Sequence, residues 1–425
     1  MHSEELVKLI CDGGLDQRLL DLYDDETKLG YQRERYIKAI RFFEQKFGAG
    51  DVTLLSVPGR SEVGGNHTDH QHGCVLACGI NLDIIAVARR SEKLTVYSNG
   101  TSLGKIDIDN LSLRDSEKHT SLALVKGVLR KLSLQGHKIG PVEAVMYSDV
   151  LVGSGLSSSA AFEVSIANMM SHFYNDGKIT PLDMAIASQY AENVYFGKPC
   201  GLMDQSACAF GGLVFIDFNN IREPFVRKLD VDFGSFGYSL CIVDTKGSHS
   251  GLTDDYAAIP EEMLSVASFF GKEVLRDVSY QQIIDNAAEL RKVCGDRAVL
   301  RALHFVEENE RPAKEAEALE KGDFERFKQL LAESGNSSFK YLQNVYTNHN
   351  VREQAVSLGI NLSEHLLRDG KGVCRVHGGG FAGTIQAFVR NDYVDEYKKG
   401  IEQLFGEKTC LILKVNKYGA CKLIG

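Results

Sequence analysis

Residues 153–161, GSGLSSSAA, limit most strongly how this chain can fold. They follow a strand-like stretch at 142–152 and open the helical pattern AAFEVSIANMM, so a strand, a tight loop and a helix are expected in succession. Gly153 and Gly155 lack a Cβ, which lets successive backbone N–H groups turn inward at the positive end of the helix. The stretch therefore predicts an anion-binding loop, and a Gly/Ser-rich helix cap without a ligand fits the same residues.

A second Gly-rich stretch, PGRSEVGGNHTDH at 58–70, places an arginine, a histidine and an aspartate in one loop after a strand-like run. Aspartate accepts hydrogen bonds from two adjacent hydroxyls, histidine donates or accepts, and Arg60 supplies a fixed positive charge. This set favours a polyhydroxylated ligand. A metal site built from His67, His70 and His72, or a solvated turn, fits the same stretch, although the histidines lack the i, i+4 spacing of a helical zinc site.

A third stretch, AENVYFGKPCGLMDQS at 191–206, places Glu192 twelve residues before Asp204. One carboxylate could bind a magnesium ion that bridges phosphates, and the other could take or orient the proton of an attacking hydroxyl. Without further context, each acid could equally be a helix cap or a surface charge.

Composition narrows the class of protein. The 425 residues exceed what one hydrophobic core usually supports, so we expect two domains, 1–225 and 226–425. A net charge of -9 gives no broad basic surface for nucleic acid, and no apolar run is long enough to span a membrane. The ten cysteines form no CxxC pair and are interpreted as reduced thiols. A cytoplasmic protein is expected, with neither nucleic acid nor membrane as a partner, and as a monomer or weak homo-oligomer.

Apolar periodicity predicts a mixed α and β order along the chain. Helices are predicted within 3–47, at 120–132, over most of 256–367 and at 392–404. Strands are predicted at 52–57, where the chain would deliver Arg60 to a loop, and at 82–98, 142–152, 213–245, 383–389 and 410–415.

In chain order, these stretches resemble the signatures of the GHMP small-molecule kinases. PGRSEVGGNHTDHQHGCVLACGI is similar to the galactokinase signature within that family, GSGLSSSAA to the ATP-binding motif, and CGLMDQ to the catalytic-aspartate segment. RVHGGGFAGT at 375–384 is similar to the third, glycine-rich motif, and SGNSSFKYLQNVY at 334–346 to a helical segment of galactokinases. The resemblance covers roughly residues 30 to 425. It implies an α+β fold in which an N-terminal domain like domain 2 of ribosomal protein S5 meets a C-terminal ferredoxin-like domain at the active site.

The resemblance also implies roles for individual residues, with ATP and Mg²⁺ as cofactors and a small sugar as substrate. Asp204 would be the catalytic aspartate beside the anomeric hydroxyl, and Arg60 the cation that keeps it ionised. Whether Asp204 removes the proton or mainly orients the hydroxyl stays open. Ser159 and Glu192 would bind magnesium. The sugar-binding residues would be Asn66, His67, Asp69, Gly201 and Tyr256. The ATP-binding residues would be Gly153, Ser154, Gly155, Leu156, Ser157, Ser158, Ser159, Gly379 and Gly380.

Three positions depart from the family pattern. Asn66 stands where galactokinases usually have Glu, His70 replaces Tyr, and Ala382 replaces Gly. Asn66 removes a negative charge at the far end of the hexose, so galacturonate stays an alternative to galactose. We expect ATP-dependent phosphorylation of the anomeric hydroxyl of galactose. A sugar 1-kinase for galacturonate, arabinose or an amino sugar is an alternative, and so is a non-catalytic sensor of galactose and ATP. Ser159 and Ala160, which such sensors tend to lose, are both present.

Overall fold

The computed structural model describes residues 1–151, 155–248 and 251–425. Over these residues the strands form two sheets, one of eight strands and one of four. The larger sheet contains β1 (Thr53–Gly64), β2 (Cys74–Arg90), β3 (Thr95–Ser98), β4 (Thr101–Ser102), β5 (Val142–Ser148), β6 (Leu213–Asp217), β7 (Phe225–Leu229) and β12 (Cys421–Ile424). Its strand order is β12-β1-β2-β5-β3-β4, and β6 and β7 extend from β2.

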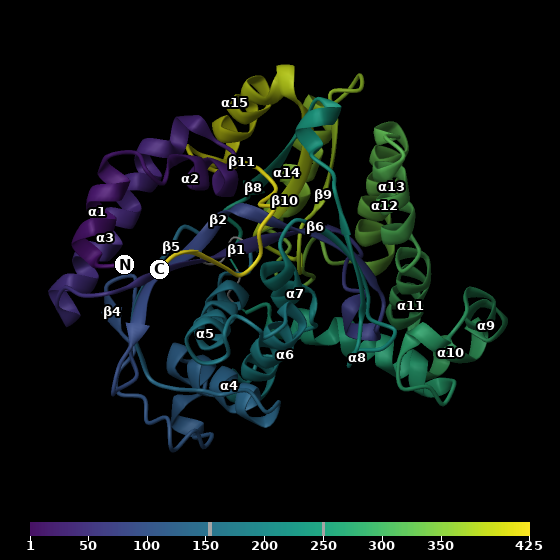
Figure 1. Cartoon of the computed structure of the whole chain (residues 1–425). Coiled ribbons are helices and arrows are strands. Elements are labelled where there is room, and N and C mark those ends of the chain that lie inside the picture. The colour runs from purple at the N-terminus through teal and green to yellow at the C-terminus, as the bar shows by residue number, and fades with distance from the viewer. Residues whose placement is uncertain (152–154, 249–250) are drawn as a thin grey trace.

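Helices cover both faces of the larger sheet. On one face lie α1 (Ser3–Cys11), α2 (Asp16–Tyr23) and α3 (Leu29–Phe47), drawn in purple in Figure 1, and on the other lie α4 (Ser121–Leu134), α5 (Ser158–Tyr174), α6 (Pro181–Tyr190) and α7 (Met203–Phe210). Successive side chains of a strand point to opposite faces. In β2, Ile85 and Val87 accordingly pack with the N-terminal helices, whereas Ile84 and Ala86 belong to the core under α4 to α7.

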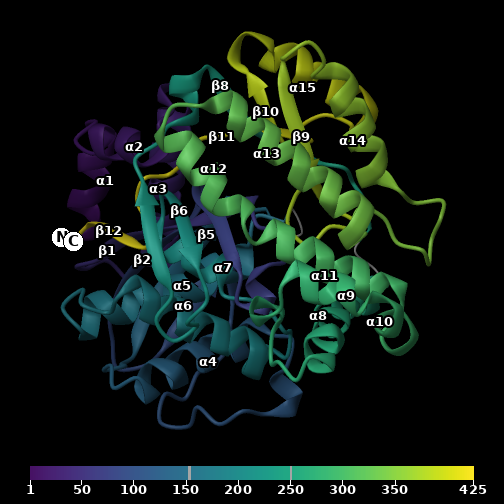
Figure 2. The same cartoon turned by 90° about the vertical axis from the view of Figure 1, so that its right-hand side faces the viewer.

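The smaller sheet has the order β11-β8-β10-β9, and all its pairs are antiparallel. Its strands are β8 (Tyr238–Asp244), β9 (Gly372–Val376), β10 (Thr384–Arg390) and β11 (Cys410–Leu413). Helices α14 (Ala355–Leu366) and α15 (Val394–Phe405) pack on it through a core of their own. The helical block before it comprises α8 (Thr253–Phe269), α9 (Tyr280–Asp285), α10 (Ala287–Val293), α11 (Asp296–Glu308), α12 (Arg311–Glu320) and α13 (Phe324–Ser337), shown in green in Figure 2.

The predicted mixture of helices and strands is confirmed, but the prediction that Arg60 lies in a loop is wrong. β1 does not end at Val57. It continues to Gly64 because the chain resumes pairing with β2 after a register shift at Pro58, so that Arg60 lies opposite Gly79. Pro58 has no N–H to donate to the ladder, which favours an irregularity at this point. Arg60 is therefore held by a strand, more rigidly than a loop would hold it.

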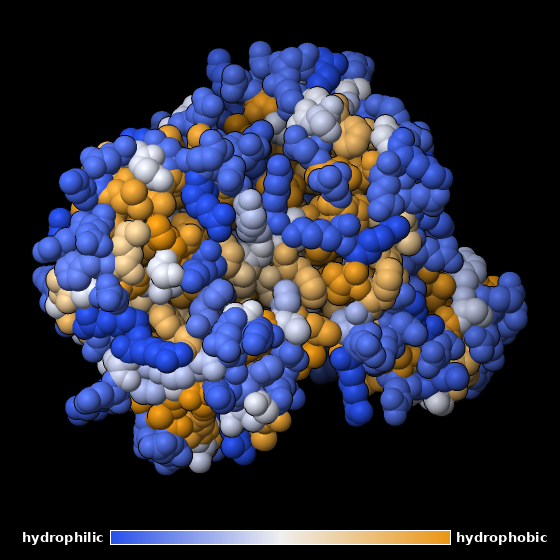
Figure 3. All heavy atoms as spheres, in the orientation of Figure 1, coloured by the Kyte–Doolittle hydropathy of each residue, from blue (hydrophilic) through white to orange (hydrophobic). Residues whose placement is uncertain are grey.

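The division into 1–225 and 226–425 stays a prediction. β7 begins at the proposed boundary and pairs with β6, while β12 pairs antiparallel with β1. The chain therefore returns to the first sheet after building the second. Within the described ranges, no helix is long and apolar enough to cross a membrane. Figure 3 shows hydrophilic side chains along most of the outline of one face, with hydrophobic ones inside it.

Candidate active site

Arg60 and Asp204 contact each other directly. Arg60 projects from β1, and Asp204 lies in the first turn of α7. Arg60 Nε donates to Asp204 Oδ1 at 2.8 Å, and Arg60 Nη2 lies 2.8 Å from the same oxygen. Ser157 Oγ donates to the other carboxylate oxygen, Oδ2, at 2.5 Å. Both oxygens of Asp204 are thus bound by the protein.

These contacts keep Asp204 ionised. Burial alone would raise the pKa of its carboxyl, but the charge of Arg60 and the hydrogen bonds from Ser157 and Arg60 outweigh burial and lower that pKa. An ionised carboxylate can accept a proton from a hydroxyl or orient that hydroxyl through a hydrogen bond.

Arg60 also fixes the loop before α5. Its guanidinium donates through Nη1 to the carbonyl of Gly155, and its backbone N–H donates to Leu156 O at 3.1 Å. Ser157 has a positive φ of 59°, and α5 begins at the next residue. The loop therefore turns sharply into a helix N-terminus beside the Arg60–Asp204 pair, which is the geometry expected of an anion-binding loop.

The predicted ATP-binding residues of this loop fall into two groups. The structure brings five of them to the helix start, namely Gly155, Leu156, Ser157, Ser158 and Ser159. The other two, Gly153 and Ser154, lie outside the described residues.

The two predicted metal ligands also meet. Ser159 Oγ donates to Glu192 Oε1 at 3.2 Å, and Lys198 Nζ lies 3.3 Å from the same oxygen. The second oxygen of Glu192 accepts a hydrogen bond of 2.9 Å from Gln205. Adjacent ligands in a magnesium octahedron, at about 2.0–2.1 Å from the metal, lie about 3 Å apart, so the Ser159 and Glu192 oxygens have a suitable spacing.

The protein alone offers few metal ligands here. Among the described residues, no group of three or more His, Cys, Asp and Glu side chains could hold a metal ion. Magnesium usually takes one or two protein oxygens and completes its shell with phosphates and water. The Ser159–Glu192 pair fits that pattern and would hold a metal only together with a phosphorylated ligand.

Glu163, on α5, is a further acid in this cluster. It is fully buried, and its Oε2 accepts a hydrogen bond from Gln205 Nε2 at 3.4 Å. Burial, with the charge of Glu192 second, raises the pKa of Glu163 well above its ordinary value. The protonated form of Glu163 is therefore favoured by its surroundings.

The third motif packs against the loop before α5, which is the predicted phosphate loop. A Cβ on Gly155 would lie 2.8 Å from Thr384 Oγ1, so the loop approaches the motif as closely as a glycine allows. Tyr256, on α8, donates its hydroxyl proton to Gly380 O at 2.9 Å, and its ring lies where a Cβ on Gly379 would come within 2.9 Å. The structure thus joins Tyr256 to the two glycines predicted to bind ATP.

Asn66 is completely buried, and protein groups occupy both ends of its amide. Its nitrogen donates to Glu62 Oε1 at 3.1 Å and to Gly378 O at 2.8 Å, and its oxygen accepts from Ser338 and Asn344. Asn66 therefore ties β1 to two segments of the second half of the chain. The sugar contact predicted for it stays a prediction.

His67 lies at the edge of the same loop. Its Nε2 lies 3.0 Å from the carbonyl oxygen of Gly379, and its ring stacks on that of His70 at a centroid distance of 5.8 Å. Burial, followed by the neighbouring His70, lowers the pKa of His67 to about 3. His67 is therefore a neutral imidazole at physiological pH.

Asp69 and Gly201 lie against each other. Asp69 Oδ2 accepts a long hydrogen bond of 3.4 Å from the backbone N–H of Met203. Both residues line a cavity of about 500 Å³, together with His70 and Cys200 among others. Two of the predicted sugar-binding residues, Asp69 and Gly201, are thus adjacent at a cavity wall. Gly201 lies three residues before Asp204 in the sequence.

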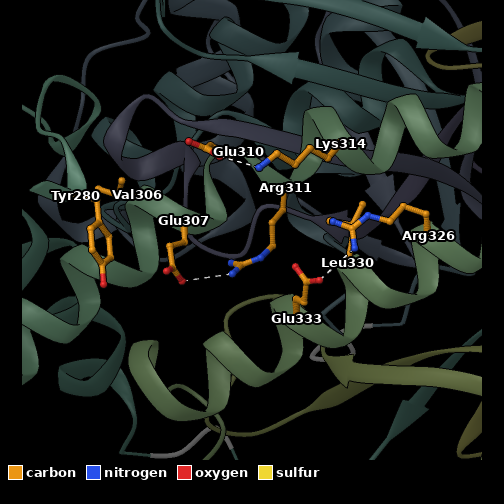
Figure 4. Close-up of a pocket in the computed structure, with 9 residues that line it drawn as sticks. All are labelled: Tyr280, Val306, Glu307, Glu310, Arg311, Lys314, Arg326, Leu330 and Glu333. Carbon is orange, nitrogen blue, oxygen red and sulfur yellow. Dashed lines mark hydrogen bonds and ion pairs between the residues drawn. The ribbon is translucent and has the colours of Figure 1, made fainter.

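A separate groove lies between α11, α12 and α13 (Figure 4). Its charged residues form ion pairs with one another, Glu307 with Arg311, Glu310 with Lys314, and Arg326 with Glu333. None of the residues predicted to act lines this groove. Its charges are balanced locally, so we assign it no role.

Sequence reasoning missed four polar residues of the site. Glu62 forms a buried ion pair with Arg375, Gln205 bonds Glu192, and Lys198 lies beside that same carboxylate. All four lie inside the sequence stretches 58–70, 191–206 and 375–384. Only the three-dimensional contacts distinguish them from the surface charges that such stretches also contain.

Two family models match the chain. Residues 123–212 match the GHMP kinases N terminal domain, and residues 41–90 match the galactokinase galactose-binding signature. The first range includes the predicted phosphate loop, Glu192 and Asp204. The second includes Arg60 and three predicted sugar-binding residues, Asn66, His67 and Asp69.

Curated relatives cover most of the chain. The galactokinase of Glaesserella parasuis serovar 5 (strain SH0165) is 32% identical over 383 residues, which are 86% of this chain and 93% of the relative. The galactokinase of Actinobacillus pleuropneumoniae serotype 3 (strain JL03) is 29% identical, over 87% of this chain and 94% of the relative.

Solved structures show the same fold. The crystal structure of Lactococcus lactis galactokinase complexed with galactose superposes with a TM-score of 0.76 at 22% identity, covering 90% of this chain and 98% of that one. The mevalonate kinase of Methanococcus jannaschii superposes with a TM-score of 0.58 at 16% identity, covering 86% and 99%. The predicted two-domain α+β fold of the GHMP kinases is thereby confirmed as the fold class.

Proposed function

Because this chain belongs to the galactokinase family of the GHMP kinases, we propose that it transfers the terminal phosphate of ATP to the anomeric hydroxyl of galactose, giving galactose 1-phosphate and ADP. Use of ATP follows from membership of a kinase family. The choice of galactose is supported by the names of the relatives and by the match to the galactose-binding signature.

One observation carries the proposal. The carboxylate of Asp204 is bonded both to Ser157 of the phosphate loop and to Arg60. A nucleotide phosphate held by that loop would therefore lie beside a carboxylate able to orient or deprotonate a sugar hydroxyl. Phosphoryl transfer depends mainly on such positioning and on neutralising the charge of the phosphate, and Arg60 supplies a fixed positive charge for this purpose.

We further propose that Ser159 and Glu192 hold Mg²⁺. When bound, the ion would neutralise phosphate charge during transfer. Ser159 and Glu192 would present two oxygens at a suitable spacing, and Gln205 would orient Glu192 by a hydrogen bond. The raised pKa of Glu163 beside them disfavours a second charged carboxylate in this cluster.

For the sugar, we propose that Asp69, His67 and Tyr256 bind hydroxyl groups, with Gly201 giving Asp69 the room it needs. Asn66 would support the position of the loop that carries His67 and Asp69, because its amide nitrogen is already bonded to Glu62 and Gly378. Galacturonate, arabinose and amino sugars are less well supported than galactose, because both curated relatives are named galactokinases. A catalytic role is supported over a sensor by Ser159 and Ala160.

The test is an ADP-release assay with ATP and separate galactose, galacturonate, arabinose, glucose and N-acetylgalactosamine. Turnover with galactose that stops in excess chelator and returns with added Mg²⁺ is expected. Preference for another sugar, or nucleotide binding without turnover, would overturn the proposal. A cytoplasmic address and a monomeric or weakly associating state stay predictions, which cell fractionation and light scattering would check.

A further inference from the structure

Lys198 lies at the rim of the active site with its ammonium group on Glu192. It follows a π-helical turn, Ala191–Phe196, and Gly197, whose φ is 89°. Lys198 Nζ lies 3.3 Å from Glu192 Oε1. The Lys198 side chain is 63% exposed, whereas that of Glu192 is 4% exposed. The ammonium group thus reaches a buried carboxylate from a side chain that is otherwise largely free in solvent.

The positive charge of Lys198 interacts with the carboxylates of Glu192 and Asp204. Its partial burial would lower the pKa of the ammonium group, but the charges of Glu192 and Asp204 outweigh that effect and raise it. In turn, Lys198 is one of the groups that lower the pKa of Asp204. Lys198 therefore contacts the proposed metal ligand directly and interacts electrostatically with the proposed catalytic carboxylate.

Glu192 Oε1 is shared by two donors, the hydroxyl of Ser159 and the ammonium of Lys198. The two oxygens proposed to hold Mg²⁺ are Glu192 Oε1 and the hydroxyl oxygen of Ser159. A divalent ion on Glu192 Oε1 would repel an ammonium group on the same oxygen, which would weaken the Lys198 contact in the loaded enzyme.

The displaced ammonium has few other anionic partners. Asp204 already receives bonds from Arg60 and Ser157 on its two oxygens. Glu163 is completely buried, and its Oε2 already accepts a hydrogen bond from Gln205. A nucleotide bound at the adjacent loop would bring anionic phosphate oxygens to this end of α5.

We propose that Lys198 is a further catalytic residue, whose ammonium leaves Glu192 and contacts the oxygens of the phosphoryl group that is transferred. This proposal rests on the proposed kinase function. In phosphoryl transfer, negative charge is spread over the three equatorial oxygens, and a mobile cation that arrives with the loaded nucleotide stabilises it. A lysine suits this task because its stem is flexible and its ammonium acts as a compact point charge.

An ordinary surface ion pair is the competing explanation. Exposed lysine–carboxylate pairs contribute little to stability, and their loss changes little else. If Lys198 is catalytic, Lys198→Met should destabilise the transition state for phosphoryl transfer. If it forms only a surface ion pair, the substitution should change nothing measurable.

The test compares Lys198→Met and Lys198→Arg with Lys178→Met, a control at an 80% exposed lysine that pairs with Asp176 at 3.7 Å. We expect Lys198→Met to lower kcat at least ~10-fold with little change in the KM for galactose, Lys198→Arg to recover most of the loss, and Lys178→Met to match the wild type.

A binding measurement supplies a second readout. Calorimetry on sugar-loaded protein measures the affinity for MgADP with and without aluminium fluoride, which mimics the transferring phosphoryl group. Lys198→Met should bind MgADP nearly normally and lose at least ~10-fold of the added affinity that aluminium fluoride gives. Retention of that added affinity would overturn the proposal, as would a loss confined to Mg²⁺ affinity with normal kcat at saturating metal. If the wild type rejects galactose, the same comparison uses the sugar that the substrate panel identifies, so the two proposals fail separately.

Discussion

The carboxylate of Asp69 fills the space beside the Cα of Gly201. A Cβ on Gly201 would come within 1.8 Å of Asp69 Oδ2, well inside the distance that any pair of unbonded atoms tolerates. Gly201 has no positive φ, so packing and not backbone conformation requires a glycine at this position. The loop that carries Asp69 and the segment that leads to Asp204 are thereby in close contact.

Gly201→Ala should displace Asp69 and raise the KM for galactose by ~10-fold or more, with a smaller effect on ATP binding. The physical reason is the overlap between the new methyl group and Asp69 Oδ2. Steady-state kinetics with each substrate varied in turn measures this. Gly30→Ala is the matched control, because a Cβ on Gly30 has nothing within 4 Å. An unchanged KM in the Gly201 variant would separate Asp69 from sugar binding.

Asp204→Asn should lower kcat by at least ~10²-fold, because an amide cannot accept the proton of the sugar hydroxyl. The amide keeps the size of the side chain, so the phosphate loop should still bind ATP, which calorimetry would check. Near-normal turnover would remove Asp204 from the chemical step.

Arg60→Met should make turnover sensitive to acid. In the wild type the pKa of Asp204 is lowered, so its carboxylate stays ionised as the pH falls from about 8 to about 5. Without the cation of Arg60, burial dominates and raises that pKa, so protonation should begin inside this range. The ratio of variant to wild-type kcat should therefore fall toward low pH. A ratio independent of pH would mean that Arg60 does not control this ionisation.

Glu315→Gln should stabilise the protein increasingly as the pH rises. Glu315 lies on α12 against Gly64, is fully buried, and has no hydrogen-bond partner for either oxygen within the part of the chain that the structure describes. Burial, with the charge of Glu308 second, raises the pKa of Glu315 to about 8 from an ordinary value of 4.5.

Between these two values the folded state binds a proton that the unfolded state has released, so stability falls as pH rises. Glutamine cannot ionise and removes this loss, which is at most about 3 kcal/mol at pH 7. Thermal unfolding at about pH 5 and about pH 8 measures the gain. Glu317→Gln, on the exposed side of α12 beside Lys321, is the control and should show no such increase.

Asn66→Asp should lower the melting temperature by several degrees. It places a second carboxylate 3.1 Å from Glu62 Oε1 and leaves Gly378 O without its donor. Asn220→Asp, in an exposed turn, is the control, because Asn220 only accepts a hydrogen bond there. A normal melting temperature with a raised KM for galactose would instead favour the direct sugar contact predicted from sequence.

The order of elements could be predicted, and candidate site residues could be proposed, from sequence because both leave local patterns. The Gly/Ser stretch before α5 and the spacing of Glu192 and Asp204 can be recognised without knowing what else surrounds them. Short strands such as β9 and β12 have weaker patterns, and neither was predicted. They form because β10 and β1 are already in place to pair with them.

Contacts between distant segments could not be predicted. Asn66 bonds residues far along the chain, among them Ser338, Asn344 and Gly378, so nothing near it in sequence shows that it is buried. Lys198 lies within residues 191–206, but a lysine in a Gly- and Pro-containing segment is usually a surface charge. Its position beside Glu192 becomes visible only when α5, the π-helical turn and α7 are assembled.

Residues 421–424 form the outer neighbour of the strand that carries Arg60. A fragment cut near residue 225 would leave the backbone amides and carbonyls along that side of β1 unpaired, open to pairing with other molecules. Producing the two halves separately should therefore yield an aggregation-prone first half, even though most of its apolar core is encoded locally. Fusions or truncations at the carboxyl end bear directly on the strand that carries Arg60.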